Sequence, residues 1–195
     1  MMWFTSDTHF GHENIIKYCD RPFKNTDHMN DEIVRRWNEV VAPTDTVFHL
    51  GDVALGRLDN SLAQVSRLNG HKILRLGNHD RPFMRMGKAD EQTWWDRYAE
   101  VFQEVWHWRG YESVNIAGEF FTLSHFPYAG DHTLTDRYAE HRLPDEGVPL
   151  IHGHVHTTDK LTHTLLGTPQ IHVGQDAWDF RPVHEDEIMN LWMGV

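Results

Sequence analysis

Five short blocks of polar residues recur along the chain, and each of them follows an apolar segment. The blocks are Asp7-Thr8-His9, Gly51-Asp52, Gly77-Asn78-His79-Asp80, Ser124-His125 and Gly153-His154-Val155-His156. Taken singly, the first four are explained as well by turns, helix caps or a hydrogen-bonded core histidine. The last block is the most specific, because two histidines at alternate positions of a strand end project from one face and can bind metal.

Together the blocks supply a ligand set for divalent transition metals, which bind carboxylate, amide and imidazole groups. The candidate ligands are Asp7, His9, Asp52, Asn78, His125, His154 and His156. A single site normally uses three or four ligands, so seven of them predict two ions that share one bridging group. The carboxylate of Asp52 has two oxygens and is the natural candidate for this bridge.

The apolar segments that precede the blocks are expected to be β-strands. Strands are predicted at 2–6, 46–50 and 72–76, and amphipathic helices at 27–41 and 58–68. This alternation is typical of a parallel α/β architecture, in which the carboxyl ends of the strands form the ligand site. After about residue 100, aromatic and β-branched residues predict further strands, hence more than one sheet, and a closing helix near 184–192. We expect one domain, residues 1–195.

Read in order, the five blocks resemble the signature of the calcineurin-like metallophosphoesterases. That signature stands here as DTH at 7–9, GD at 51–52, GNHD at 77–80, His125 and GHVH at 153–156. The downstream QIHVGQDAWDFRPV also resembles the closing strand of small single-domain bacterial and phage members. His49 and His152 match no ligand position of the pattern, so we expect them in the core or behind the ligands.

The resemblance implies an α/β fold, a four-layer αββα sandwich with two central mixed β-sheets and the metal site at the C-terminal strand edge. One ion would take Asp7, His9, Asp52 and His156. The other would take Asp52, Asn78, His125 and His154. His79 would be the catalytic histidine beside the scissile phosphate, which a hydroxide held between the ions attacks. Manganese is favoured as the metal, and iron, cobalt, nickel and zinc also suit these ligands.

A phosphoric ester hydrolase is the implied activity, and one departure from the family pattern narrows its substrates. Phosphoprotein phosphatase relatives carry an aspartate three residues after the bridging aspartate, with an arginine following it. Here Leu55 occupies that position and Arg57 is displaced. We therefore expect small phosphodiesters, nucleotides or cyclic nucleotides among them, and some phosphomonoesters as substrates. Candidate substrate-binding residues are His12, Arg81, Phe126 and Tyr128, and the polar segment 127–147 is a candidate rim or lid.

The composition limits the partners that this chain is expected to bind. Its formal net charge of −11 argues against a stable nucleic-acid complex, although metal-binding carboxylates contribute to that charge. A nuclease that cuts short or single strands is the alternative, and a non-catalytic protein-binding scaffold on the same fold is less favoured, since all seven ligands and His79 are present. A single cysteine, Cys19, and the absence of a signal peptide or apolar span predict a cytoplasmic protein with no membrane partner.

Overall fold

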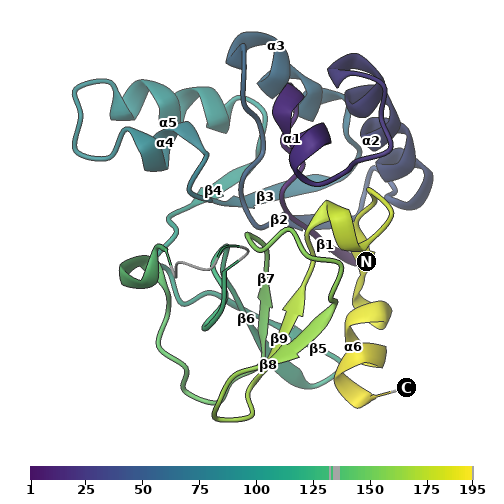
Figure 1. Cartoon of the computed structure of the whole chain (residues 1–195), viewed down its shortest axis with the longest axis vertical. Helices are drawn as coiled ribbons and strands as arrows, with labels where there is room; N and C mark the ends of the chain where they lie inside the picture. The colour runs from purple at the N-terminus through teal and green to yellow at the C-terminus, as the bar shows by residue number, and fades with distance from the viewer. Residues whose placement is uncertain (132, 134–136, 195) are drawn as a thin grey trace.

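Two five-stranded mixed β-sheets form the centre of the structure, a computed structural model that describes residues 1–131, 133 and 137–194 (Figure 1). The first sheet has the order β10-β1-β2-β3-β4, in which β1 to β4 are parallel and β10 is antiparallel to β1. Its strands are β1 (Met2–Thr5), β2 (Thr46–His49), β3 (His71–Arg75), β4 (Glu104–Trp106) and β10 (Val183–His184). The three strands predicted in the first half of the chain are therefore confirmed.

The second sheet has the order β5-β6-β7-β9-β8, with three parallel strands in its middle. At its two edges, β5 pairs antiparallel with β6 and β8 pairs antiparallel with β9. The strands are β5 (Ser113–Ile116), β6 (Glu119–Leu123), β7 (Leu150–His152), β8 (Leu161–His163) and β9 (Pro169–His172). These are the further strands that the aromatic and β-branched composition after residue 100 predicts.

Helices from the first hundred residues cover the outer face of the first sheet, whereas the last helix packs beside strands of both sheets (Figure 1). The helices are α1 (Glu13–Tyr18), α2 (Thr26–Val40), α3 (Leu58–Leu62), α4 (Arg81–Met84), α5 (Glu91–Ala99) and α6 (Glu185–Met193). Helix α2 begins where the Asn25 side chain accepts a hydrogen bond from the His28 amide, and it buries Met29, Ile33 and Trp37 at a spacing of four. Helix α6 closes the chain and contacts β1 and β9, one strand from each sheet. In the described part of the chain, no helix is long and apolar enough to cross a membrane.

The segment 58–68 differs from the single helix that its apolar spacing predicts. It forms the short helix α3 and then a 3₁₀ segment, η1 (Ala63–Arg67). The last apolar steps, from Leu62 to Val65 and from Val65 to Leu68, are three residues each. A 3₁₀ helix has three residues per turn, so this geometry keeps all three side chains on the buried face.

An apolar core joins the two sheets into a sandwich. Phe4 and Phe48 of the first sheet stack with ring centroids 5.4 Å apart, and Ile151 and Ile171 of the second sheet belong to the same buried cluster. Because side chains alternate along a strand, His152, Gln170 and His172 lie on the opposite, outer face of the second sheet. The predicted α/β sandwich with two central mixed sheets is confirmed.

His49 ends β2 beneath the polar edge of the first sheet, where it is buried and fully hydrogen-bonded. The Gly51 amide donates to its Nδ1 at 3.2 Å, so Nε2 carries the proton and donates to Thr8 Oγ1 at 3.0 Å. The Thr8 hydroxyl in turn donates to the Val53 carbonyl. Both ring nitrogens are therefore used in the neutral form, and burial lowers the pKa of His49 to about 3.

We expect His49 to make the stability of the metal-free protein depend on pH. Its folded-state pKa lies below the unfolded value of about 6.5, so the unfolded chain binds more protons, and stability falls as pH falls from 6.5 towards 3. The slope from one such group is about 1.4 kcal/mol per pH unit. Urea unfolding of chelated protein between pH 7 and 4.5 should show this slope reduced in His49→Gln. Parallel slopes for the two proteins would contradict it.

Candidate metal centre

The candidate ligands meet at one edge of the sandwich, beyond the carboxyl ends of β1, β2, β3, β6 and β7. Parallel strands place their carboxyl ends at the same edge, so residues far apart in the sequence converge there. Six of the seven are buried: Asp7, His9, Asp52, Asn78, His125 and His154. His156 is the seventh and lies partly exposed beside them. The structure thus brings together all seven residues predicted from the sequence.

Five of these ligands have a backbone conformation that L-residues rarely adopt. Their φ angles are positive: Asp7 at 59°, His9 at 50°, Asp52 at 57°, His154 at 73° and His156 at 49°. Such conformations are destabilising by about 1–3 kcal/mol each and concentrate at functional sites. Their clustering at one sheet edge indicates that the backbone here is shaped to aim side chains, not to minimise local strain.

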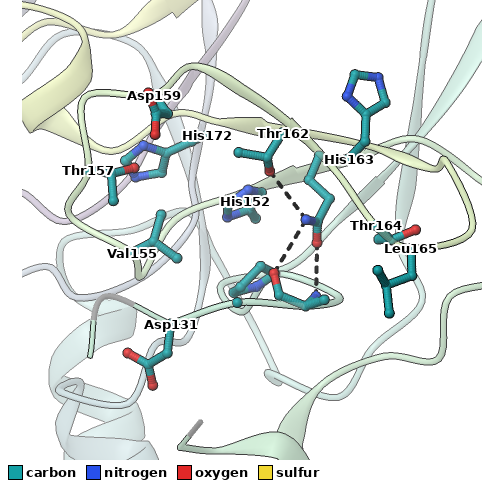
Figure 2. A pocket seen from close by; sticks show the side chains of 14 residues that line it. Asp131, His152, Val155, Thr157, Asp159, Thr162, His163, Thr164, Leu165 and His172 are labelled. Carbon is teal, nitrogen blue, oxygen red and sulfur yellow. Dashed lines mark hydrogen bonds between the residues drawn. The ribbon is translucent and has the colours of Figure 1, made fainter. Parts of the chain in front are cut away.

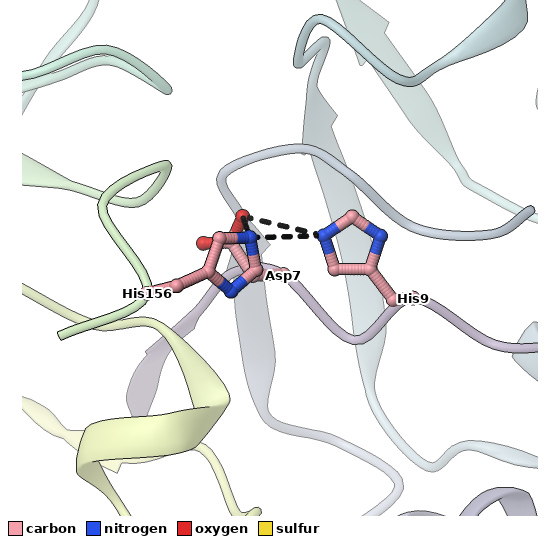
Figure 3. Close-up of side chains that lie close together, drawn as sticks. All are labelled: Asp7, His9 and His156. Atoms are coloured by element: carbon pink, nitrogen blue, oxygen red, sulfur yellow. Dashed lines mark hydrogen bonds and ion pairs between the residues drawn. The ribbon is translucent and has the colours of Figure 1, made fainter. Parts of the chain in front are cut away.

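The first group of candidate ligands comprises Asp7, His9, Asp52 and His156, of which Figure 3 shows Asp7, His9 and His156. The Nε2 atoms of His9 and His156 face each other at 3.2 Å. Asp7 Oδ1 lies 3.8 Å from the His9 Nε2 atom and 3.6 Å from that of His156, and Asp52 Oδ2 lies 3.7 Å from His9 Nε2. Three donor atoms, one each from Asp7, His9 and His156, all lie within 4.8 Å of one another, the spacing of ligands around one cation.

The second group comprises Asp52, Asn78, His125 and His154. Asn78 Oδ1 lies 3.0 Å from His125 Nε2 and 2.9 Å from His154 Nδ1, and His125 Nε2 lies 3.6 Å from Asp52 Oδ1. The Nδ1–H of His125 donates to the Leu50 carbonyl at 2.6 Å. That bond leaves Nε2 as the lone-pair donor, which is how a backbone carbonyl commonly fixes a metal-binding histidine.

Asp52 stands between the two groups, with one carboxylate oxygen facing each. Oδ2 is directed at His9 and Oδ1 at His125. Oδ1 also accepts a hydrogen bond from the His79 amide at 2.8 Å, which holds the carboxylate in this orientation. A carboxylate presented in this way can bind two cations at once.

The hydrogen bonding of the buried Asp7 carboxylate indicates whether these residues suit a metal ion. Asp7 Oδ2 accepts a hydrogen bond from the His154 amide at 2.9 Å, whereas Oδ1 has no hydrogen-bond partner among the described residues. Burial raises the pKa of Asp7, but His156, His125 and His9 outweigh it and hold the pKa well below its usual range. A buried ionised oxygen without a donor is costly unless a cation is bound. Oxygen and imidazole nitrogen donors together suit a divalent transition metal.

Two glycines allow the turns after β2 and β3 to approach each other closely. A Cβ on Gly51 would lie 2.4 Å from the Gly77 nitrogen, and a Cβ on Gly77 would lie 2.4 Å from Asp52 Oδ1. The side chain of Asp80 ties these turns together by accepting from the amides of Gly77, Asp52 and Val53. Burial and the charge of Asp52 raise the pKa of Asp80 to about 7. These contacts explain why the Gly-Asp and Gly-Asn-His-Asp blocks have these residue types.

Asp176 and Arg21 support the first group of ligands, and neither was predicted from the sequence. Asp176 Oδ2 accepts a hydrogen bond from His156 Nδ1 at 3.0 Å, so His156 presents Nε2 to the first group. Arg21 binds both Asp176 oxygens, at 2.7 and 2.9 Å, and donates to the carbonyls of Asp7 and Thr8. The only signal in the sequence was the segment QIHVGQDAWDFRPV, in which no single residue stands out as a ligand.

We expect Asp176→Asn to weaken metal binding by about 10- to 100-fold, the usual effect of removing a carboxylate that orients a ligating histidine. The amide keeps the shape of the side chain but removes the charge that Arg21 and His156 share. Competition with a chromophoric chelator measures the affinity, and urea unfolding of the metal-free protein reports stability separately. Asp179→Asn, which removes an exposed carboxylate paired with Arg36, is the control. Equal metal affinities for the two variants would contradict the prediction.

A cavity of about 580 Å³ opens above the first group of ligands. His9, His156 and His79 line it, together with His12, Tyr18, Cys19, Leu55 and Arg137. His79 and His9 lie with ring centroids 5.6 Å apart. The predicted catalytic histidine therefore faces the same space as the ligands.

The four predicted substrate-binding residues are placed differently. His12 lines the cavity. Phe126 is buried among His125, His154 and Tyr138 and packs behind the ligands. Arg81 lies over the Trp94 ring, and the Tyr128 hydroxyl donates to the Val148 carbonyl. Of the four, His12 alone is placed to contact a small molecule bound in this cavity. Part of the predicted rim, residues 132 and 134–136, lies outside the described residues.

Comparison with known proteins finds close relatives of the whole chain. No protein-family model matches it. The gene 66 protein of Mycobacterium phage L5 is 38% identical over 197 residues, covering 97% of this chain and 92% of that protein. The gene 66 protein of phage D29 is 37% identical over 195 residues, covering 94% and 92%. An uncharacterised protein of Methanocaldococcus jannaschii is 31% identical over 194 residues, covering 97% and 90%.

Two solved structures also resemble the chain. A protein of unknown function from Aquifex aeolicus has a TM-score of 0.70 and 32% sequence identity, and the match covers 98% of each chain. A phosphopantetheinyl hydrolase from Mycobacterium tuberculosis has a TM-score of 0.45 and 14% identity, over 93% of this chain and 95% of that one. The second similarity is distant.

Proposed function

The chain belongs to the family of the gene 66 proteins of mycobacteriophages L5 and D29, and we propose that it hydrolyses phosphoric esters with two divalent metal ions. One observation carries this proposal: the Asp52 carboxylate lies between two clusters of ligands and directs one oxygen at each. Hydrolases with two metal ions use this arrangement to bind both the attacking and the leaving side of a phosphoryl group. A structural metal site is normally closed by four ligands around one ion.

Asp7, His9, Asp52 and His156 would hold one ion, and Asp52, Asn78, His125 and His154 the other. When bound, the two ions supply positive charge that neutralises phosphate oxygens and lowers the pKa of water. His79 faces the cavity above the ligands, and its backbone amide is fixed by Asp52. We assign to its ring the donation of a proton to the departing oxygen of the ester.

The cavity favours small esters as substrates. Leu55 lines its wall at the position where phosphoprotein phosphatase relatives have an aspartate, so a charged pair with His79 is not formed there. Small phosphodiesters, nucleotides included, are therefore the preferred class, with phosphomonoesters as weaker substrates. Manganese is the metal that we expect to support the reaction best.

Hydrolysis of two chromogenic esters tests the proposal. Chelated protein should not cleave bis(p-nitrophenyl) phosphate or p-nitrophenyl phosphate, and manganese should restore cleavage, more strongly for the diester. Bound metal is measured on the same samples, with a value of two ions per chain expected. Protein that binds two ions and cleaves neither ester nor any of a panel of nucleotide diesters would refute the proposed activity. Protein that binds no metal would refute the metal centre itself.

A further inference from the structure

A second cavity, of about 370 Å³, lies on the outer face of the second sheet (Figure 2). Its floor is made by side chains of β7, β8 and β9: His152, Thr162, Gln170 and His172. The segment 127–131 and the residues after the Gly-His-Val-His block form its walls. This volume lies within the range of cavities that bind small molecules. None of the roles proposed above uses it.

The floor of this cavity carries buried imidazoles that lack hydrogen-bond partners. His152 Nδ1 donates to the Gly153 carbonyl at 2.8 Å, so its Nε2 is an acceptor, and it has no partner among the described residues. Among the described residues, neither nitrogen of His172 has a hydrogen-bond partner of good geometry, although the Asp159 backbone approaches it. The two side chains are only 2% and 1% exposed. Buried polar atoms of this kind are normally satisfied, so a ligand or water belongs there.

The other polar side chains of the floor do not satisfy these nitrogens, because they are already engaged. The Gln170 amide accepts from the Ala129 amide at 3.0 Å and donates to the Ala129 carbonyl and to Thr162 Oγ1. These bonds are drawn in Figure 2. Thr164 Oγ1 donates to Asp145. The hydrogen-bonding groups of the floor that lack a described partner are therefore those of the two histidines. His152 offers an acceptor, and His172 offers a donor or an acceptor.

The charge of the lining disfavours an anionic ligand. Asp131 and Asp159 line the cavity, whereas no lysine or arginine is among its described lining residues. The remaining walls include Pro127, Ala129 and Val155, which offer apolar surface to the faces of a ring. A ligand that suits this cavity is uncharged and has hydrogen-bonding groups along one edge.

The cavity borders the one above the metal centre. Val155 and Thr157, on either side of the ligand His156, line both of them. Asp131 Oδ2, in its wall, lies 3.8 Å from the Nε2 atom of the ligand His154. A molecule whose phosphoryl group lies at the metal centre can therefore extend an uncharged part over the Val155–Thr157 segment into this space.

We propose that this cavity is the subsite for the nucleobase of a nucleotide ester, recognised by His152 and His172 on the outer face of the second sheet. A nucleobase is planar and uncharged, and its edge carries adjacent donors and acceptors, as an enclosed base site requires. A donor of the base meets His152 Nε2, and a second edge group meets His172. The inference rests on the proposed hydrolase function, because that function places the phosphoryl group at the metal centre.

Esters with and without a nucleoside group test the subsite. Manganese-loaded full-length protein is assayed with the p-nitrophenyl esters of the four nucleoside 5′-monophosphates and with methyl p-nitrophenyl phosphate. We expect kcat/KM to be at least ~10-fold higher for one or more of the nucleotide esters, about the effect of one satisfied buried hydrogen bond. Calorimetric titration with the free nucleosides, which carry no phosphate, measures binding to the subsite without any hydrolysis.

His172→Phe, which fills the same space without polar atoms, should remove this preference and the nucleoside binding while changing methyl ester hydrolysis less than ~2-fold. Ala129→Leu narrows the cavity from the opposite wall and should have the same effect if His172→Phe does not fold. His71→Phe replaces an exposed histidine of β3 and is the control.

Each outcome separates the subsite from the hydrolase. Equal rates for nucleotide and methyl esters, with no nucleoside binding, would overturn the subsite and leave the hydrolase standing. Equal losses on both esters in His172→Phe and Ala129→Leu would also overturn it, because the variants would then act through the metal centre. Nucleoside binding that His172→Phe abolishes, in a protein that cleaves no ester, would support the subsite and refute the proposed function.

Discussion

Replacing Asp52 with asparagine should lower kcat/KM for the chromogenic diester by at least about 10³-fold, or about 4 kcal/mol of transition-state stabilisation. The same variant should bind one ion per chain where the unmodified protein binds two. The two effects have one cause, since a bridging carboxylate supplies a ligand atom and a negative charge to both positions. Metal content after desalting and steady-state hydrolysis at saturating manganese measure them on one preparation.

The geometry indicates which ion is lost. Asp52 Oδ1 accepts the His79 amide hydrogen, and only the oxygen of an asparagine amide can accept it. The amide nitrogen must then occupy the place of Oδ2, facing His9. An NH₂ group is a donor and binds no metal, so the ion of the Asp7, His9 and His156 group should be the weaker one.

Asp45→Asn is the matched control, because Asp45 is also buried but lies away from the site, bound to the Trp3 indole and the chain's amino terminus. It should lower stability and leave the metal content unchanged. An Asp52→Asn protein that keeps two ions and more than a tenth of its activity would show that Asp52 is not the bridge.

The sequence predicted where the candidate ligands come together, because each of them follows a strand. Parallel strands bring their carboxyl ends to one edge whatever the intervening helices do, so Asp7, Asp52 and Asn78 had to lie near one another. The match of the five blocks to the family signature then identified the histidines as further candidate ligands. The strain at these positions, with five positive φ angles, could not be predicted, because it is imposed by the turns that meet there and not by local preference.

The sequence predicted the supporting residues poorly because their roles depend on contacts between distant segments. Asp176 and Arg21 are 155 positions apart, and neither lies in a block. Phe126 and Tyr128 were candidates for substrate contact through their proximity to His125 in the sequence. A strand end exposes only some directions to the cavity, so Phe126 packs behind the ligands and Tyr128 turns to Val148. Nearness along the chain does not determine the direction of a side chain.

His79→Ala should lower kcat by about 10²- to 10⁴-fold for esters with an alkoxide leaving group, the usual contribution of a general acid. A p-nitrophenolate leaves readily as an anion, so the same variant should lose much less activity on bis(p-nitrophenyl) phosphate. The metal content should stay at two ions per chain, because the His79 ring is not a ligand and its amide contact with Asp52 survives the substitution.

The dependence on the leaving group is what separates proton donation from simple substrate binding by His79. His12 lines the same cavity, and His12→Ala removes an imidazole of the same size. If histidines there only bind the phosphate, both variants should lose activity equally on alkyl and p-nitrophenyl esters. If His79 protonates the leaving oxygen, its loss alone should steepen the dependence of rate on the basicity of the leaving group. A series of diesters graded in leaving-group pKa therefore decides the role, and parallel plots for His79→Ala and the unmodified protein would exclude proton donation.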